Sequence, residues 1–207
     1  MAVDFSLYLI SDRHQVHPNH TLHSAIDAAL QGGVKAVQLR EKDLETADLL
    51  ALAQSLRQLT RQYHAKLFIN DRIDIALAVD ADGVHLTETS VSVLDARQQL
   101  GNDKLIAAST HSLERAQQAE QQGADFITFS PIFFTASKAA FGEPQGLDKL
   151  RSICDKTSLP VFALGGITPQ RIQSVSQAGA AGIALISGIL ASPNPCEAAQ
   201  HFYTPKL

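Results

Sequence analysis

Short apolar segments recur along the chain at intervals that suit a parallel β-sheet. There are eight of them, at residues 7–11, 36–40, 66–70, 83–86, 105–109, 126–130, 161–165 and 182–187. Several are apolar at consecutive positions, as strands are when both faces of a sheet are covered. Helical patterns of apolar residues lie between them, at residues 24–31, 47–63, 112–122 and 169–178. This alternation predicts βαβ units.

A weak internal repeat precedes every second strand segment. "LQGGVKAVQL", "AVDADGVHL", "QQGADFITF" and "QAGAAGIAL" each run from a helix end through Gly or Asp into an apolar strand. Glycine after a helix is ordinary capping chemistry, but eight strands with this repeat favour a closed barrel over an open doubly wound sheet. We therefore predict an α/β protein, a single-domain (β/α)₈ TIM barrel over residues 1–207 with short loops.

Composition and charge narrow the classes of function. The chain is 45% hydrophobic and carries a formal net charge of −4 with no basic run, which argues against nucleic acid or an anionic membrane as partner. No apolar run approaches the ~20 residues of a membrane span, and the N-terminus does not resemble a signal peptide. The only cysteines, Cys154 and Cys196, form no disulfide framework. We expect a soluble, cytoplasmic protein, with a homo-oligomer as one possibility.

The carboxyl ends of the predicted strands carry the chemistry, as expected for a barrel of this kind. After the seventh strand, Gly165 and Gly166 would let the backbone approach a ligand, Thr168 could cap the next helix, and Pro169 suits its first position. Ser187 follows the eighth strand. A helix N-terminus here predicts a phosphate site, with a plain tight turn as the alternative.

A second anion site is indicated by cations at other strand ends. Arg40 and Lys42 follow the second strand, and Lys138 lies after the sixth with Thr135 and Ser137. These side chains suit a diphosphate, although most lysines are simply solvated.

A carboxylate completes this second site. Asp71, beside Asn70, could hold Mg²⁺, which needs only one or two carboxylates besides substrate phosphates.

The histidines differ in how well their positions suit metal binding or catalysis. His14, His17, His20 and His23 are spaced by three but lie in a Pro- and Asn-containing loop, so we predict no metal site there. His85 points opposite to its apolar neighbours, as an interior or mouth residue. His111 is placed either for general acid–base catalysis or as a cap of the helix beginning at Ser112.

Taken together, the motifs resemble those of the thiamine phosphate synthases and their relatives, the thiazole tautomerases. The matching stretches are "VQLREKD", "FINDRIDIALAVDADGVHL", "STHSLERAQQAEQQGADFITFSPIF", "TASK", "ALGGITPQRI" and "AGIALISGIL". They cover nearly the whole chain in the right order. The resemblance implies a (β/α)₈ barrel acting on phosphorylated thiamine precursors.

The resemblance also implies residue roles for a synthase. The aminopyrimidine would contact Gln38 and Asn70, and its diphosphate would bind Arg40, Lys42, Thr135, Ser137 and Lys138. Asp71 would bind Mg²⁺, and Ser109 would lie near the reacting groups. The thiazole phosphate site would be lined by Gly166, Ile186 and Ser187.

One stretch departs from the synthase pattern. Synthases continue the fourth strand as Gly-Gln-(Glu/Asp)-Asp, whose last Asp is the second metal ligand, and Ser90 stands there in this chain. Glu88 could replace that ligand only if the loop rearranged, because two residues along a strand shift position by about 6–7 Å.

Two alternatives to the synthase therefore stay open. Tautomerases commonly lack this Asp and use a histidine at the position of His111. A non-catalytic relative that binds thiamine phosphates is the third hypothesis. The joint presence of Gln38, Lys42, Asn70, Asp71 and Lys138 favours the synthase.

Overall fold

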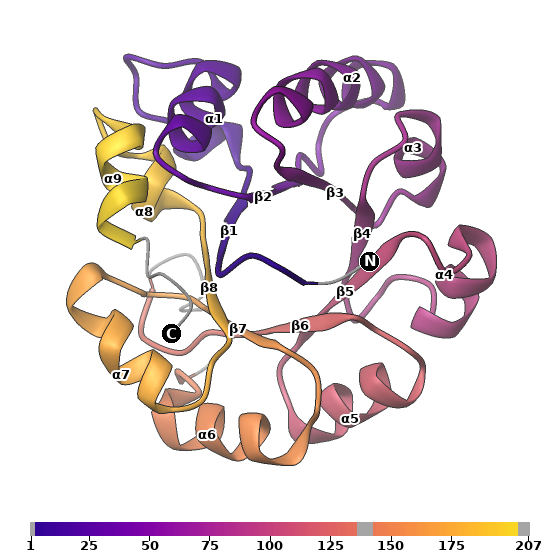
Figure 1. Ribbon diagram of the computed structural model, residues 1–207, viewed down its shortest axis with the longest axis vertical. Helices are drawn as coiled ribbons and strands as arrows, with labels where there is room; N and C mark the ends of the chain where they lie inside the picture. Colours follow the sequence, from indigo (N-terminus) through magenta and orange to yellow (C-terminus); the bar gives the residue numbers. More distant parts are fainter. Residues whose placement is uncertain (1–2, 136–142, 203–207) are drawn as a thin grey trace.

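The computed structural model describes residues 3–135 and 143–202, and its centre is a closed barrel of eight parallel strands. The strands are β1 (Leu7–Ile10), β2 (Ala36–Leu39), β3 (Lys66–Asn70), β4 (Gly83–Leu86), β5 (Leu105–Thr110), β6 (Phe126–Phe129), β7 (Val161–Leu164) and β8 (Gly182–Leu185). Each pairs with its neighbour in sequence, and β8 closes onto β1 (Figure 1). The predicted (β/α)₈ barrel is confirmed.

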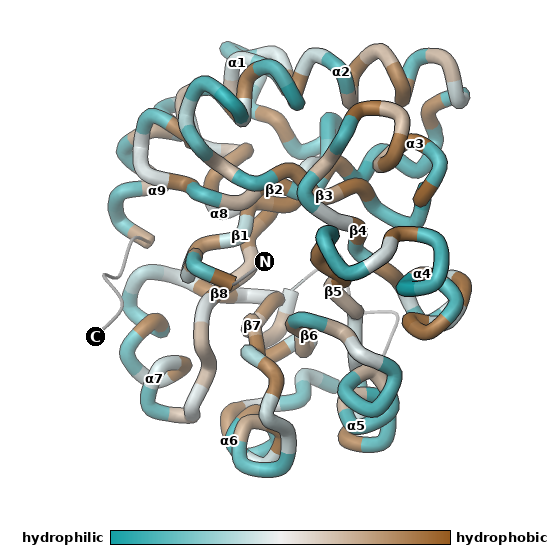
Figure 2. The backbone as a smooth tube through the Cα atoms, turned by 45° about the vertical axis from the view of Figure 1, so that its right-hand side comes forward, coloured by the Kyte–Doolittle hydropathy of each residue, from teal (hydrophilic) through white to brown (hydrophobic). Residues whose placement is uncertain are grey.

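Helices surround the barrel. They are α1 (Leu22–Gln31), α2 (Thr46–Gln62), α3 (Ile73–Ala78), α4 (Val93–Leu100), α5 (Leu113–Gln121), α6 (Gly146–Lys156), α7 (Ile172–Gln177), α8 (Ser187–Leu190) and α9 (Pro195–Phe202), with short 3₁₀ turns η1 (Arg13–Gln15) and η3 (Pro169–Arg171). In Figure 2 the strands are mostly brown, whereas the helices carry hydrophilic teal stretches. Within the described ranges, no helix is long and apolar enough to cross a membrane.

Alternation along the strands separates two apolar layers. One set of side chains packs under the helices, and the other fills the barrel with the aromatic rings of Phe5, Tyr8, Phe68, Phe126 and Phe162. The rings of Phe126 and Phe162 lie 5.1 Å apart between centroids. The apolar filling occupies the amino-terminal part of the interior, so polar inward residues are left for the carboxyl-terminal mouth.

Two similar ion pairs brace the amino-terminal end of the barrel. Asp82, just before β4, accepts from the Leu67 N–H at 2.7 Å and from Arg57 Nη1 at 2.6 Å. Asp125, just before β6, accepts from the Ile106 N–H at 2.7 Å and from Arg97 Nη2 at 2.6 Å. Each of these two carboxylates links a helix to two strands. Asp82 and Asp125 belong to the repeated stretches "AVDADGVHL" and "QQGADFITF", so these two copies of the repeat have a structural role.

The segment after β7 differs in detail from the expectation. The helix predicted at 169–178 is present as α7, but it is preceded by the 3₁₀ turn η3. The prediction that Thr168 caps this helix is wrong, because its side chain makes no capping hydrogen bond. Pro169 does occupy the first position. Because Gly166 turns the chain with a φ of 64°, Arg171 can donate to its carbonyl at 2.7 Å, and this contact closes the turn instead.

Candidate active site at the barrel mouth

Two cavities open at the carboxyl-terminal mouth. The first, of about 270 Å³, we call the β2–β4 cavity; it is lined by Leu39, Glu41, Lys42, Leu44, Leu49, Asn70, Asp71, Arg72, Thr87 and Thr89. The second, of about 430 Å³, we call the β7–β8 cavity; it is lined by Gln15, Ser130, Pro131, Thr135, Leu164, Gly165, Gly166, Ile167, Thr168, Ala184, Leu185, Ile186, Ser187, Gly188 and Ala191. Their linings contain most of the predicted site residues.

The turn after β3 brings a carboxylate to the β2–β4 cavity. Asn70 ends β3, and Asp71 has a φ of 63°, a left-handed conformation that Asp tolerates better than most residues. The Asp71 N–H donates to the His85 carbonyl at 3.0 Å, which fixes this turn against β4. Arg72 is turned to Asp74, with which it makes hydrogen bonds of 2.8 and 2.6 Å. The guanidinium of Arg72 is therefore already paired with a carboxylate, and the other charged residues of this lining are Glu41, Lys42 and Asp71.

Glu41, the other carboxylate of this lining, is buried and already engaged. Its Oε1 accepts from Ser11 Oγ at 2.6 Å, and its Oε2 accepts from the Arg13 N–H at 3.1 Å. Ser11 Oγ in turn accepts from the Arg40 N–H at 2.8 Å. Glu41 therefore joins the ends of β1 and β2 and sets the backbone that carries Arg40. Sequence reasoning missed this role, because the acidic residue within "REKD" carries no local signal of burial.

The β7–β8 cavity is shaped by glycine. A Cβ on Gly166 would lie 2.6 Å from the Phe134 carbonyl oxygen and 2.8 Å from Phe133 Cβ, and Gly165 has a φ of 99°. The loop after β6 therefore packs directly on the Gly165–Gly166 backbone, with the Phe133 N–H donating to the Gly165 carbonyl at 3.0 Å. Across the cavity α8 begins at Ser187, and the first N–H groups of a helix have no intrahelical acceptor. Such N–H groups suit a phosphate.

A chain of polar side chains crosses the barrel interior below the mouth. Gln38 Nε2 donates to Tyr8 Oη at 3.1 Å, and Tyr8 Oη lies 3.2 Å from His85 Nδ1. His85 Nε2 lies 2.9 Å from Ser109 Oγ. Burial, and secondarily the charge of Arg40, lowers the pKa of His85 to about 3, so the imidazole is neutral. The expectation that His85 points inward is confirmed.

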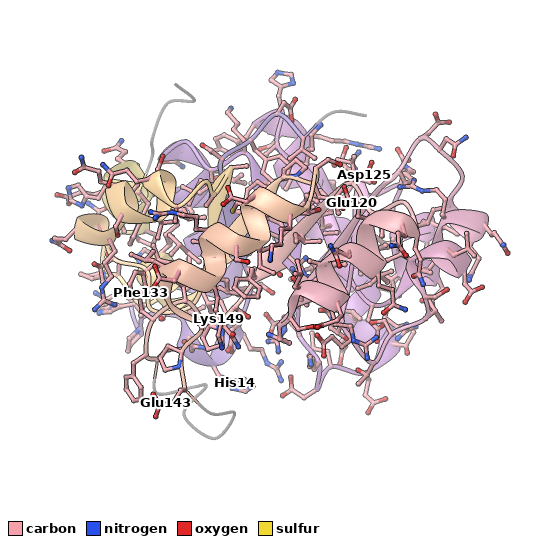
Figure 3. All side chains as sticks on the ribbon, turned by 90° about the horizontal axis from the view of Figure 1, so that it is seen from below. His14, Glu120, Asp125, Phe133, Glu143 and Lys149 are labelled. Carbon is pink, nitrogen blue, oxygen red and sulfur yellow. The ribbon has the colours of Figure 1, made fainter. Side chains whose placement is uncertain are left out.

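His111 lies just beyond β5 at the same end of the barrel. Its Nδ1 donates to the Ser130 carbonyl at 2.8 Å, so this ring nitrogen carries a proton. Ser112, not His111, caps α5 by accepting from the Arg115 N–H, so the alternative of a capping histidine is wrong. Figure 3 shows His14, Phe133 and Glu143 at the mouth end, and Asp125 toward the opposite end.

The hydroxyl groups of the loop after β4 form hydrogen bonds within the loop. Ser90 Oγ accepts from the Thr87 N–H at 2.8 Å and lies 2.9 Å from Thr87 Oγ1. Thr87 and Thr89 line the cavity that contains Asp71, whereas Glu88 and Ser90 line a neighbouring one with Ser109 and Arg115. Neither Glu88 nor Ser90 lines the cavity that contains Asp71, but Ser90 is hydrogen-bonded to Thr87, which belongs to both linings, whereas no such contact joins Glu88 to that cavity among the described residues.

The remaining predicted residues are placed as follows. Gln38 and Ser109 belong to the interior chain, and Thr135, Ile186 and Ser187 line the β7–β8 cavity, although Thr135 was expected at the diphosphate. Ser137 and Lys138 lie outside the described residues. Within the four-histidine loop, His14 Nε2 bonds Asp43 at 3.1 Å and His20 Nε2 bonds the Pro193 carbonyl at 3.1 Å.

Sequence reasoning missed two further residues of the site, Tyr8 in the interior polar chain and Gln15 in the lining of the β7–β8 cavity. Tyr8 is hidden in an apolar run, and Gln15 of η1 comes from a loop whose path the sequence does not reveal. The inward alternation of β1 was the only signal that could have found Tyr8.

A closed (β/α)₈ barrel with a glycine-shaped cavity after β7 and β8 defines the class, since that is the usual phosphate position in such barrels. Residues 7–189 match the profile of the family described as thiamine monophosphate synthase. The chain belongs to this family and is an enzyme of thiamine biosynthesis.

Individual relatives agree with this assignment. The chain is 53% identical over 198 residues to a putative thiamine-phosphate synthase of Geobacter sulfurreducens, covering 96% of this chain and 92% of the relative. It is 42% identical to a thiamine-phosphate synthase of Desulfitobacterium hafniense, covering 97% and 96%. The solved thiamine phosphate pyrophosphorylase from Pyrococcus furiosus superposes with a TM-score of 0.86 at 36% identity, covering 95% and 93%. These names support the synthase, not the tautomerase.

Proposed function

We propose that the protein joins 4-amino-5-hydroxymethyl-2-methylpyrimidine diphosphate to a thiazole phosphate and releases diphosphate. The observation that carries the proposal is the pair of cavities at one barrel mouth, with the Gln38–Ser109 chain in the interior below them. One cavity offers Lys42, Asn70 and Asp71, and the other offers glycine backbone and a helix start. Two phosphorylated substrates need two such regions.

The aminopyrimidine and its diphosphate are assigned to the first region. Gln38 and Asn70 point into the barrel from β2 and β3 and offer amide groups to the pyrimidine. Cations stabilise the negative charge that develops on the departing diphosphate. We assign that task to Arg40, Lys42, Ser137 and Lys138; Thr135, the other residue expected there, lines the β7–β8 cavity. Ser109 is assigned to the place where the pyrimidine carbon and the thiazole nitrogen would meet, because β5 lies between the strands of the two cavities in the barrel order.

The thiazole phosphate is assigned to the β7–β8 cavity. Gly166 lets the backbone approach the phosphate, and Ser187 adds a hydroxyl and the first N–H of α8. Ile186 would pack against the ring. The thiazole nitrogen then attacks the pyrimidine carbon as the bond to the diphosphate oxygen breaks.

A magnesium ion fits this site through Asp71. In residues 3–135 and 143–202, no three His, Cys, Asp or Glu side chains gather as a metal cluster. Mg²⁺ is nevertheless often bound by one or two carboxylates together with substrate phosphates, and Asp71 supplies one carboxylate in the β2–β4 cavity. The ion would neutralise diphosphate charge when substrate is bound. Thr87 and Thr89, across the cavity, offer hydroxyls rather than a second carboxylate.

We place the reaction in the cytoplasm. Cys154 and Cys196 are free thiols, as proteins of a reducing compartment keep them. Burial raises the pKa of the Cys154 thiol to about 11, so this thiol stays protonated and unreactive.

The test of the proposed function is a two-substrate assay. Purified protein with both precursors and Mg²⁺ is expected to form thiamine phosphate and diphosphate, and removal of Mg²⁺ with a chelator should lower the rate at least about tenfold. In the same assay with Mg²⁺ present, Lys138→Ala should abolish most of the synthase activity. Isomerisation of a thiazole carboxylate phosphate that is lost in His111→Ala and unaffected by Lys138→Ala would instead show a tautomerase. Ligand binding without turnover would show a binding protein.

Substitution of Ser90 tests the weakened metal position. Ser90→Asp is expected to raise kcat/KM at limiting Mg²⁺ by about tenfold, since one carboxylate oxygen can keep the Thr87 N–H bond while the other becomes available to the metal. The measurement is the Mg²⁺ concentration at half-maximal rate, which should fall. Ser90→Asn, which keeps the loop contact without the charge, is the control. Equal rates for both variants at every Mg²⁺ concentration would contradict the metal argument.

A further inference from the structure

In the interior chain of hydrogen bonds from Gln38 to Ser109, the donor and the acceptor of each bond can be assigned. Tyr8 has one hydroxyl hydrogen, and its oxygen already accepts from Gln38 Nε2, so the hydrogen is donated to His85 Nδ1. A neutral imidazole whose Nδ1 accepts carries its proton on Nε2. His85 Nε2 therefore donates to Ser109 Oγ at 2.9 Å.

The hydroxyl hydrogen of Ser109 is therefore not used in the hydrogen bond with His85. Because its oxygen accepts from His85, the Ser109 hydroxyl hydrogen is left to be donated elsewhere. Ser109 is half-buried on the inward face of β5 near the mouth, whereas Gln38, Tyr8 and His85 are buried. The hydroxyl can thus present a donor to a bound substrate. The other end of the chain holds the Gln38 amide with its NH₂ group toward Tyr8.

We infer that His85 is a positioning residue that fixes the Ser109 hydroxyl as a donor toward the reacting groups and, through Tyr8, fixes the Gln38 amide. The inference rests on the proposed function, because it assigns the two ends of the chain to different steps. The Ser109 end acts on the bond that is forming or breaking and so on kcat. The Gln38 end acts on pyrimidine binding and so on KM for the pyrimidine diphosphate.

The chemistry of the imidazole explains why histidine suits this position. Its two nitrogens are on opposite edges of one rigid ring, so one residue accepts from Tyr8 and donates to Ser109 at the same time. The Thr128 hydroxyl, 3.5 Å from His85 Nε2, adds a second polar neighbour on the Ser109 side. Burial keeps the ring uncharged, so the direction of the chain does not reverse in the neutral range.

Two matched substitutions separate the two ends. His85→Asn can place an amide oxygen near the Nδ1 position and keep the Tyr8 contact, but it does not reach Ser109. His85→Gln can place an amide nitrogen near the Nε2 position and keep the donor to Ser109. With thiamine phosphate formation as readout, His85→Asn should lower kcat about tenfold with KM for the pyrimidine diphosphate nearly unchanged. His85→Gln should raise that KM about fivefold or more while kcat stays within about threefold.

A double-mutant cycle completes the test. In a Ser109→Ala background, His85→Asn should cause no further loss of kcat, because Ser109 is the group through which it acts. Leu105→Val, which loosens the same interior without a hydrogen bond to the chain, should lower Tm with kcat preserved. Parallel changes of kcat and KM in His85→Asn and His85→Gln, or a further tenfold loss in the Ser109→Ala background, would overturn the inference. Absence of turnover in the unmodified protein would instead refute the proposed function.

Discussion

Gly166→Ala is expected to raise KM for the thiazole phosphate by about a hundredfold. The new Cβ would lie 2.6 Å from the Phe134 carbonyl oxygen and 2.8 Å from Phe133 Cβ, so the turn or the loop after β6 must move. Movement of the turn would cost the phosphate two backbone hydrogen bonds, each worth about 1.5 kcal/mol to a charged acceptor. Their sum, about 3 kcal/mol, corresponds to about a hundredfold in affinity. Steady-state kinetics with the thiazole phosphate varied will measure it.

Gly123→Ala is the matched control for this substitution. Gly123 also has a positive φ, 88°, but a Cβ there meets nothing within 4 Å. Both variants therefore carry the backbone strain of an L-residue in the left-handed region, about 1–2 kcal/mol, and only Gly166→Ala adds the collision at the cavity. An equal KM in the two variants would mean that Gly166 serves the turn alone and does not shape a phosphate site.

Asp125→Ala is expected to destabilise the protein by about 2–3 kcal/mol. The substitution removes the acceptor of both the Ile106 N–H and Arg97 Nη2, and it leaves a largely buried guanidinium without its counter-ion. For a chain of this size the loss corresponds to a fall in Tm of about 5–10 °C. Thermal and urea unfolding will measure it.

Asp4→Ala provides the comparison for an exposed pair. Asp4 lies 3.5 Å from Lys66 Nζ and is 68% exposed, so its removal should cost less than about 1 kcal/mol. Neither variant touches the mouth, and kcat of the folded protein should be unchanged in both. A similar Tm for Asp125→Ala and Asp4→Ala would show that the ion pair beside β6 contributes no more than a surface contact.

The barrel could be predicted from the sequence because its signals are repeated and local. Each strand is a short apolar run, and the alternation with helices recurs along the whole chain, so an error in one segment would not change the architecture. The glycine turn beside the β7–β8 cavity was also foreseeable, since paired glycines such as Gly165 and Gly166 after a buried strand let the backbone turn and lie close to a neighbouring group. Thr168 shows the limit, because its side chain makes no capping hydrogen bond and the turn is instead closed by Arg171, which donates to the Gly166 carbonyl.

The polar interior could not be predicted for a different reason. Tyr8, Gln38, His85 and Ser109 come from four strands, and their hydrogen bonds depend on strand register and barrel closure. Glu41 is similar, because its burial follows from Ser11 and Arg13 on a neighbouring strand end. The hydroxyl of Ser90 could be read as a missing metal ligand, but only the loop geometry shows that Thr87 already uses it.

The two ion pairs at the amino-terminal end also divide the molecule into halves. The Arg57–Asp82 pair joins elements up to β4, and the Arg97–Asp125 pair joins elements from α4 onward. Among the ion pairs of the described residues, the exposed contact between Asp80 and Lys104 is the one that links the two sides. A chain break in the loop at residues 87–92 would leave both internal braces intact. The fragments β1–β4 and β5–β8 with their helices would each keep one of these two ion pairs.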